Sequence, residues 1–120
     1  MSLPKDDIAL LIDIYECTVN IFELVKGMKA YHFEKDKKTR WAVERQFEII
    51  GVASQKISNE TRDLLPQIPW SGIIGLRNVI AHDYAELIIA KIWYTIKNSL
   101  PTLKKELQKI EDLKEYINKN

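Results

Sequence analysis

The sequence predicts an all-α fold, an antiparallel bundle of four to five helices. Apolar residues recur at intervals of three and four along most of the chain, which is the period of a helix with one buried face. Strand-like alternation, a glycine-rich phosphate loop and internal repeats do not occur in the sequence. Only four glycines and four prolines interrupt its 120 residues. A chain of this length fits one domain, residues 1–120, with a core of its own.

Composition and charge exclude several classes of protein. Hydrophobic residues make up 46% and charged residues 29%, a balance that disordered and low-complexity chains do not have. The net charge is only +1, so a local basic surface would be needed to attract a polyanion. One cysteine and two histidines can form neither an internal disulfide nor a closed zinc site, and we expect no metal and no cofactor. Because signal-peptide and membrane-span patterns are missing, we expect a cytoplasmic protein without a membrane partner.

The first helix is expected to begin at Pro4 and to end at about Tyr31. Proline suits the first turn, where its missing N–H would have no helical partner, and Asp6 and Asp7 complement the helix dipole. Cys17 lies along this helix. It is interpreted as a small buried hydrophobic residue, the alternative being a reactive thiol.

A polar connection over residues 31–40 is expected next, with His32 as a solvated loop residue. Thr39 or Asp36 can cap the following helix, which is predicted over about residues 41–57. Within that helix, Gly51 allows a close approach of a neighbouring helix because it has no side chain.

A short third helix, capped by Ser58 or Asn59, is predicted to reach Leu65, where Pro66 stops it. Another helix should follow Tyr84 and be interrupted at residues 98–101, which end in a proline. Its apolar seam then continues to about residue 117, with a possible kink at the same proline.

A concentration of polar side chains distinguishes residues 69–84. Ser71 can cap a helix there, and apolar residues at three- and four-residue spacing predict that this helix lies in the core. The helix then delivers Arg77, Asn78, His82 and Tyr84 within eight residues. Arg77 and His82 are about 140° apart around an ideal helix. A common site would therefore lie at a helix end or at a subunit interface. Alternatively, the two cations only satisfy the last carbonyls of their own helix.

The spacing Arg77-x4-His82-x-Tyr84 reproduces the R-x4-H-x-Y signature of HEPN-domain proteins. Residues 68–70, 75–78 and 82–84 resemble the HepT-like toxin branch, and the resemblance extends over about residues 6–117. It implies a HEPN bundle that dimerises through the region of the signature helix and brings two motifs to a shared cleft. It also implies a metal-independent endoribonuclease, held in check as a toxin by a nucleotidyltransferase-like antitoxin. Val52 departs from this branch, which commonly has a glutamate there.

The residue types agree with RNA cleavage by attack of the 2′-hydroxyl on the neighbouring phosphorus. His82 can transfer protons, because a free histidine side chain titrates at about pH 6.5. Arg77 carries a planar, permanently charged fork that matches phosphate oxygens and suits the charge of the transition state. Asn78 can orient the phosphate or the histidine. Asp83 is interpreted as a solvated acid at the helix end.

Tyr84 has three interpretations: a substrate-binding residue, an interface tyrosine, or, as the resemblance implies, the residue to which the antitoxin transfers AMP. The segment 26–45 carries an excess of four positive charges, which is either ordinary solvated surface or a track for the RNA backbone. The expected partners are RNA rather than DNA, a second copy of the chain and the antitoxin. The alternative from another class is a non-catalytic HEPN module that binds a nucleotidyltransferase or a nucleotide.

Overall fold

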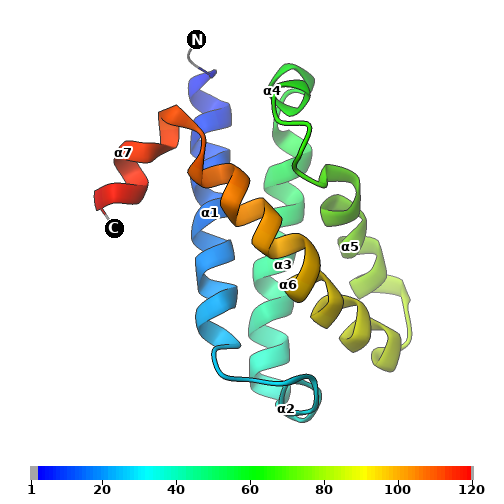
Figure 1. The fold of residues 1–120 in the computed structure, drawn as a ribbon. Coiled ribbons are helices and arrows are strands. Elements are labelled where there is room, and N and C mark those ends of the chain that lie inside the picture. Colours follow the sequence, from blue (N-terminus) through cyan, green and yellow to red (C-terminus); the bar gives the residue numbers. More distant parts are fainter. Residues whose placement is uncertain (1–2, 120) are drawn as a thin grey trace.

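The computed structural model describes residues 3–119, and every regular element among them is a helix (Figure 1). The prediction of an all-α bundle is confirmed. The helices are α1 (Lys5–Leu24), α2 (Ala30–Lys35), α3 (Lys37–Lys56), α4 (Asn59–Leu64), α5 (Trp70–His82), α6 (Ala85–Gln108) and α7 (Glu111–Lys119). None of the helices in this part of the chain is both long and apolar enough to cross a bilayer.

The long helices α1 and α3 run side by side and form the centre of the bundle, and α5 packs on the other side of α3 (Figure 1). Helix α6 crosses α1 and also contacts α5, while α2 and α4 lie at opposite ends of the bundle (Figure 1). One continuous apolar core joins these helices. Its fully buried side chains include Leu11, Ile14, Ile21, Phe33, Val43, Phe47, Ile50, Leu103, Leu107 and Leu113.

The first helix is shorter than predicted. It ends at Leu24 rather than near Tyr31, because the chain turns at Gly27, whose φ of 77° lies in the left-handed region. The expected loop after it contains the short helix α2, in which Phe33 is buried. His32 is therefore a helix residue, and its Nδ1 accepts a hydrogen bond of 2.9 Å from the backbone N–H of Lys29.

Two of the predicted helix caps are present. Asp36 accepts a hydrogen bond of 3.0 Å from the backbone N–H of Thr39, so α3 begins at Lys37, four residues earlier than predicted. This backbone hydrogen bond, the first of several contributions, lowers the pKa of Asp36. Ser58 caps α4 by accepting from the backbone N–H of Thr61.

Ser58, which is half-buried, also joins the buried Asp7 and Thr61 in a polar cluster that ties α1 to α4. The carboxylate of Asp7 accepts hydrogen bonds from the backbone N–H of Ser58 at 3.2 Å and from its hydroxyl at 2.6 Å. The hydroxyl of Thr61 is a third donor to Asp7. Burial alone would raise the pKa of Asp7, but these three hydrogen bonds lower it. Asp7 is thus a structural acceptor as well as an acid near a helix N-terminus.

The last predicted interruption is absent. Helix α6 continues through Pro101 to Gln108, and the chain turns only at Lys109 and Ile110 before α7. Proline removes one backbone donor, but Leu100 and Leu103 on either side are fully buried. The burial of this apolar seam outweighs the lost hydrogen bond, so the helix is not broken there.

Cys17 is buried on α1, as predicted. Burial, followed by the nearby carboxylates of Asp13 and Glu16, raises the pKa of its thiol to about 11. The burial of Cys17 confirms that it is a packing residue, and the raised pKa disfavours the thiolate form that a nucleophile needs.

Candidate functional site

Helix α5 carries the signature, and its start differs from the prediction. The helix begins at Trp70, so Ser71 lies in its first turn and does not cap it. The indole N–H of Trp70 donates to the carbonyl of Leu65 at 3.1 Å and fixes this end of the helix. Ile73 and Leu76 are buried against the core, as the spacing predicted. This apolar side anchors α5, and its polar residues are left at the rim of the core.

Arg77 is held by the neighbouring helix α3. Its Nη1 donates a hydrogen bond of 2.9 Å to Oε1 of Gln55. Its Cγ and Cδ lie so close to Gly51 that a Cβ built there would be 2.6 and 2.4 Å from them. The guanidinium is thus directed toward α3, which argues against the interpretation that Arg77 caps the end of its own helix.

Arg77 and Asn78 border the same open pocket of about 360 Å³, together with Glu48, Ile80 and Ala81. Asn78 is exposed and Arg77 is half-buried. An open pocket that contains a guanidinium and a carboxamide can receive a phosphate. Glu48 adds an acceptor at the rim and forms an exposed ion pair with Arg45 at 3.5 Å.

His82 is the last residue of α5 and is exposed. Within the described part of the chain, the residues that line the pocket of Arg77 do not include His82. The same holds for Tyr84, which is 82% exposed at the N-cap of α6. The single chain therefore brings Arg77 and Asn78 together at one pocket and leaves His82 and Tyr84 on the surface outside it.

The turn between α5 and α6 is fixed by Asp83, whose carboxylate accepts a hydrogen bond of 2.7 Å from Nζ of Lys91. Asp83 is thus an acid at the helix end, as predicted, and it has a surface ion-pair partner in Lys91. The backbone N–H of Asp83 also donates to the carbonyl of Val79 at 3.0 Å. The position of His82, between these anchored residues, is thus set by the backbone of the turn.

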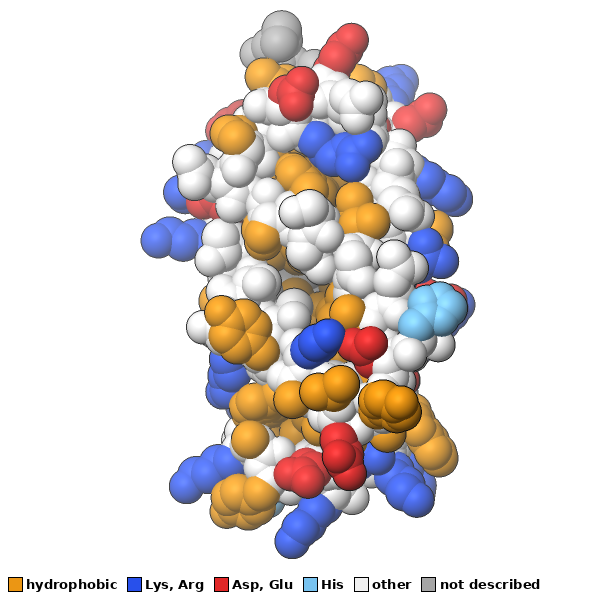
Figure 2. All heavy atoms as spheres, turned by 90° about the vertical axis from the view of Figure 1, so that its right-hand side faces the viewer, with side chains coloured by type: hydrophobic (Ala, Val, Ile, Leu, Met, Phe, Trp, Pro, Cys, Tyr) orange, Lys and Arg blue, Asp and Glu red, His pale blue; other side chains and the backbone are white. Residues whose placement is uncertain are grey.

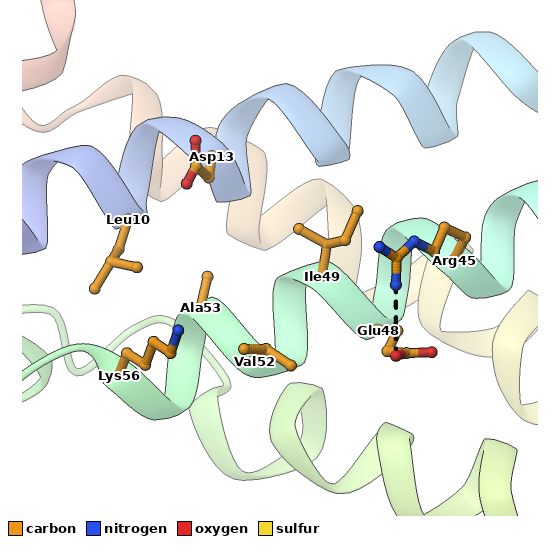
Figure 3. Close-up of a pocket in the computed structure, with 8 residues that line it drawn as sticks. All are labelled: Leu10, Asp13, Arg45, Glu48, Ile49, Val52, Ala53 and Lys56. Atoms are coloured by element: carbon orange, nitrogen blue, oxygen red, sulfur yellow. Dashed lines mark hydrogen bonds and ion pairs between the residues drawn. The ribbon is translucent and has the colours of Figure 1, made fainter.

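A second pocket, of about 230 Å³, lies between α1 and α3 and contains Val52 (Figure 3). Its other lining residues are Leu10, Asp13, Arg45, Glu48, Ile49, Ala53 and Lys56. Val52 lines this second pocket, whereas Glu48, one helical turn earlier, borders both pockets. The pocket of Arg77 thus has an acidic side chain at its border, that of Glu48.

The sequence did not single out Gln55 and Glu48. Both are polar residues of an amphipathic helix, a pattern that is typical of any solvated face. Gly51 was predicted to allow a close approach of another helix, and the group that approaches it is the side chain of Arg77. In the described part of the chain, no three His, Cys, Asp or Glu side chains are grouped so that they could hold a metal ion.

The fold and this site define a helical-bundle protein with an arginine, an asparagine and a histidine at the end of a core helix. The family model "Ribonuclease HepT-like" matches residues 14–110. The chain therefore belongs to the HepT-like ribonuclease family, as the resemblance of its signature predicted.

Relatives from three organisms match most of the chain. A protein of Methanocaldococcus jannaschii named as a candidate RNase is 36% identical over 107 residues, 88% of this chain and 98% of the relative. A protein of Thermococcus cleftensis named as a candidate ribonuclease HepT is 37% identical over 100 residues, 83% of this chain and 91% of the relative. A candidate RNase of Caldanaerobacter subterraneus is 34% identical over 97 residues, which are 81% of this chain and 86% of the relative. No solved structure matches the chain.

Proposed function

We propose that this protein is a metal-independent endoribonuclease, the toxin of a toxin–antitoxin pair, and that Arg77 and His82 carry out the cleavage. The observation that supports this most is the setting of Arg77. Its guanidinium is fixed beside Asn78 at an open pocket, and an exposed histidine follows at the end of the same helix. Membership of the HepT-like ribonuclease family indicates RNA as the substrate.

In the proposed reaction the 2′-oxygen of RNA attacks the neighbouring phosphorus, and the bond from phosphorus to the 5′-oxygen breaks. A base removes the proton of the 2′-hydroxyl, and an acid gives a proton to the departing 5′-oxygen. His82 supplies one of these roles, and the His82 of a second copy can supply the other. Arg77 stabilises the charge that develops on the phosphorane oxygens, and Asn78 orients the phosphate.

The ends of the products test this mechanism. We expect RNA fragments with a 2′,3′-cyclic phosphate and a 5′-hydroxyl, formed equally well in the presence of a metal chelator. An RNA with a single 2′-deoxy substitution at the cut site should resist cleavage, because it lacks the nucleophile. Mass spectrometry of the fragments identifies the ends. Activity that is lost in chelator and restored by magnesium would contradict the proposal, and so would cleavage of the deoxy-substituted RNA at the same bond.

The basic segment 26–45 provides a surface for the RNA backbone. It covers the turn that follows α1, helix α2 and the first half of α3, at the end of the bundle where α2 lies (Figure 1). Its lysines are exposed, and Arg40 donates to the backbone carbonyl of Glu34. The turn between α5 and α6 lies in the same half of the bundle (Figure 1), so RNA that follows this surface can reach the site.

We propose that the active form is a homodimer with a shared cleft. Figure 2 shows hydrophobic side chains gathered over the lower part of the face that α5 and the start of α6 form. Leu87 and Tyr94 of α6 are 48% and 65% exposed, and Tyr94 also lines a groove of about 570 Å³ between α5 and α6. An apolar face of this kind is typical of an interface between subunits.

A charged substitution within this face tests the dimer. We expect multi-angle light scattering to show a dimer at micromolar concentration and Tyr94→Asp to shift it to the monomer with loss of cleavage, because a carboxylate would be buried unpaired. Leu64→Asp is a matched control, since Leu64 is 54% exposed on α4. A monomeric wild-type protein that still cuts RNA would refute the shared cleft.

We propose further that a nucleotidyltransferase-like antitoxin regulates the site by transferring AMP to Tyr84. The phenol is 82% exposed two residues after His82, so a modifying enzyme can reach it. A bulky anion there would occupy the approach to His82 and repel RNA phosphate. Mass spectrometry after incubation with ATP and such a partner checks whether Tyr84 is the residue modified.

A further inference from the structure

The side chain of Arg77 crosses from α5 to α3 and rests on a single face of α3. Gly51 and Gln55 are four residues apart, one turn of helix, and so lie on the same side of α3. The aliphatic part of Arg77 lies on the backbone of Gly51, and the guanidinium reaches Gln55 with an Nη1-to-Oε1 distance of 2.9 Å. Helix α3 therefore contacts this one side chain at two places, its aliphatic part at Gly51 and its guanidinium at Gln55.

The contact at Gly51 requires a residue without a side chain. A Cβ at position 51 would be 2.4 Å from Cδ of Arg77, closer than real Cβ atoms approach another heavy atom. The atoms that it would meet belong to the middle of the arginine side chain, so the whole guanidinium would have to leave its position. Gly72 of α5 is a useful contrast, because a Cβ built there meets nothing within 4 Å.

The contact with Gln55 uses only one donor of the guanidinium. Arginine has five N–H donors in a rigid plane, and the hydrogen bond from Nη1 to Gln55 leaves the others free to bind an anion. A neutral amide also leaves the positive charge of Arg77 intact, whereas a carboxylate would compensate it. Both properties suit an arginine that must be ordered before a phosphate arrives.

We propose that Gly51 and Gln55 are positioning residues that hold the Arg77 guanidinium in place for the transition state of RNA cleavage. This inference rests on the proposed function, since it assigns a role to Arg77 in that reaction. Catalytic groups that are fixed in advance stabilise the transition state without first being reorganised, and small displacements of such groups are costly to the rate. Neither residue needs to contact RNA.

The orientation of Arg77 can be measured without any RNA. The Nε–H signal of Arg77, identified by its loss in Arg77→Lys, reports by NMR relaxation how ordered the guanidinium is. We expect Gln55→Ala and Gly51→Ala to lower this order clearly. Gln55→Glu should keep the order of the guanidinium at the wild-type level, because a carboxylate oxygen accepts the same hydrogen bond. Gln67→Ala, an exposed glutamine outside the site, is the control and should leave the signal unchanged.

The same proteins are then compared in RNA cleavage. We expect kcat to fall about 10-fold in Gln55→Ala and about 100-fold in Gly51→Ala, with KM changed less than about 2-fold, because the transition state is affected and not ground-state binding. Far-ultraviolet circular dichroism and light scattering on the same samples should show an unchanged fold and oligomeric state. A purely structural role would instead lower activity only in proportion to the folded fraction.

The outcomes separate this inference from the function on which it rests. Unchanged Arg77 order in both Gln55→Ala and Gly51→Ala overturns the positioning role, whatever the activity. Lowered order with wild-type kcat overturns it as well. If the wild-type protein does not cut RNA, the proposed function fails, and with it the part of this inference that concerns cleavage, while the NMR result still decides whether α3 holds the arginine.

Discussion

Replacing Arg77 or His82 by alanine should abolish RNA cleavage and leave the folded protein intact. Proton transfer by a positioned side chain is worth about 100- to 10,000-fold, and a donor to a developing oxyanion about 100- to 1,000-fold. We therefore expect kcat to fall by at least about 100-fold in each variant. Growth inhibition by the expressed protein should be lost in parallel.

The stability of these variants should hardly change. His82 is exposed, and substitutions at exposed positions stay within about 0.5 kcal/mol. Arg77→Ala loses one hydrogen bond to an exposed partner and some packing on Gly51, which costs about 1 kcal/mol. Tm and cleavage should be measured on the same preparations, with Arg62→Ala as a control on α4.

The alternative interpretations make different predictions for the same two variants. A pair of residues that only stabilised the helix end would lower activity in proportion to unfolding. A non-catalytic binding module would bind RNA or its partner protein and cut nothing even in the wild-type form. Folded Arg77→Ala and His82→Ala proteins that cut RNA at the wild-type rate would contradict the assignment of this site.

Replacing Asp7 by alanine should have a large effect on stability. The substitution removes the acceptor of three hydrogen bonds, two from the half-buried Ser58 and one from the fully buried hydroxyl of Thr61. Hydrogen bonds to charged groups and buried donors without partners each contribute on the order of 1–3 kcal/mol, and they are not additive. We expect urea denaturation to show a loss of about 2–4 kcal/mol. Asp6→Ala, an exposed acid of the same first turn, should cost much less.

The pH dependence of this contribution has a definite sign. The folded protein lowers the pKa of Asp7 below its value in the unfolded chain, which is about 3.9 for a free aspartate. The ionised form is thus the one that folding favours, and its contribution is fully present above the unfolded pKa. It is lost as the pH falls through the unfolded and then the folded pKa. The stability difference between wild type and Asp7→Asn should therefore shrink below about pH 4. A constant difference down to pH 2 would contradict this assignment.

Local sequence signals determined the helices wherever a strong pattern met no competing contact. The periodicity of α3 and α5 and the caps at Asp36 and Ser58 depend on residues close in the sequence, and the structure contains them. Predictions failed where a single residue was weighed without its surroundings. Pro101 was expected to break a helix that buried leucines continue, and Gly27 was not expected to end one.

The candidate site could be proposed from the sequence because its residue types and their spacing lie in one short segment. The spacing of Arg77 and His82 also predicted that they would not share a face of the helix. What surrounds them depended on the packing of α5 against α3, which brings Gln55 to Arg77 across 22 positions of the chain. No local pattern contains such a contact, because it arises only when two apolar faces pack in one register. The sequence by itself thus determined which polar groups the candidate site has, and the tertiary structure decided how the arginine among them is held.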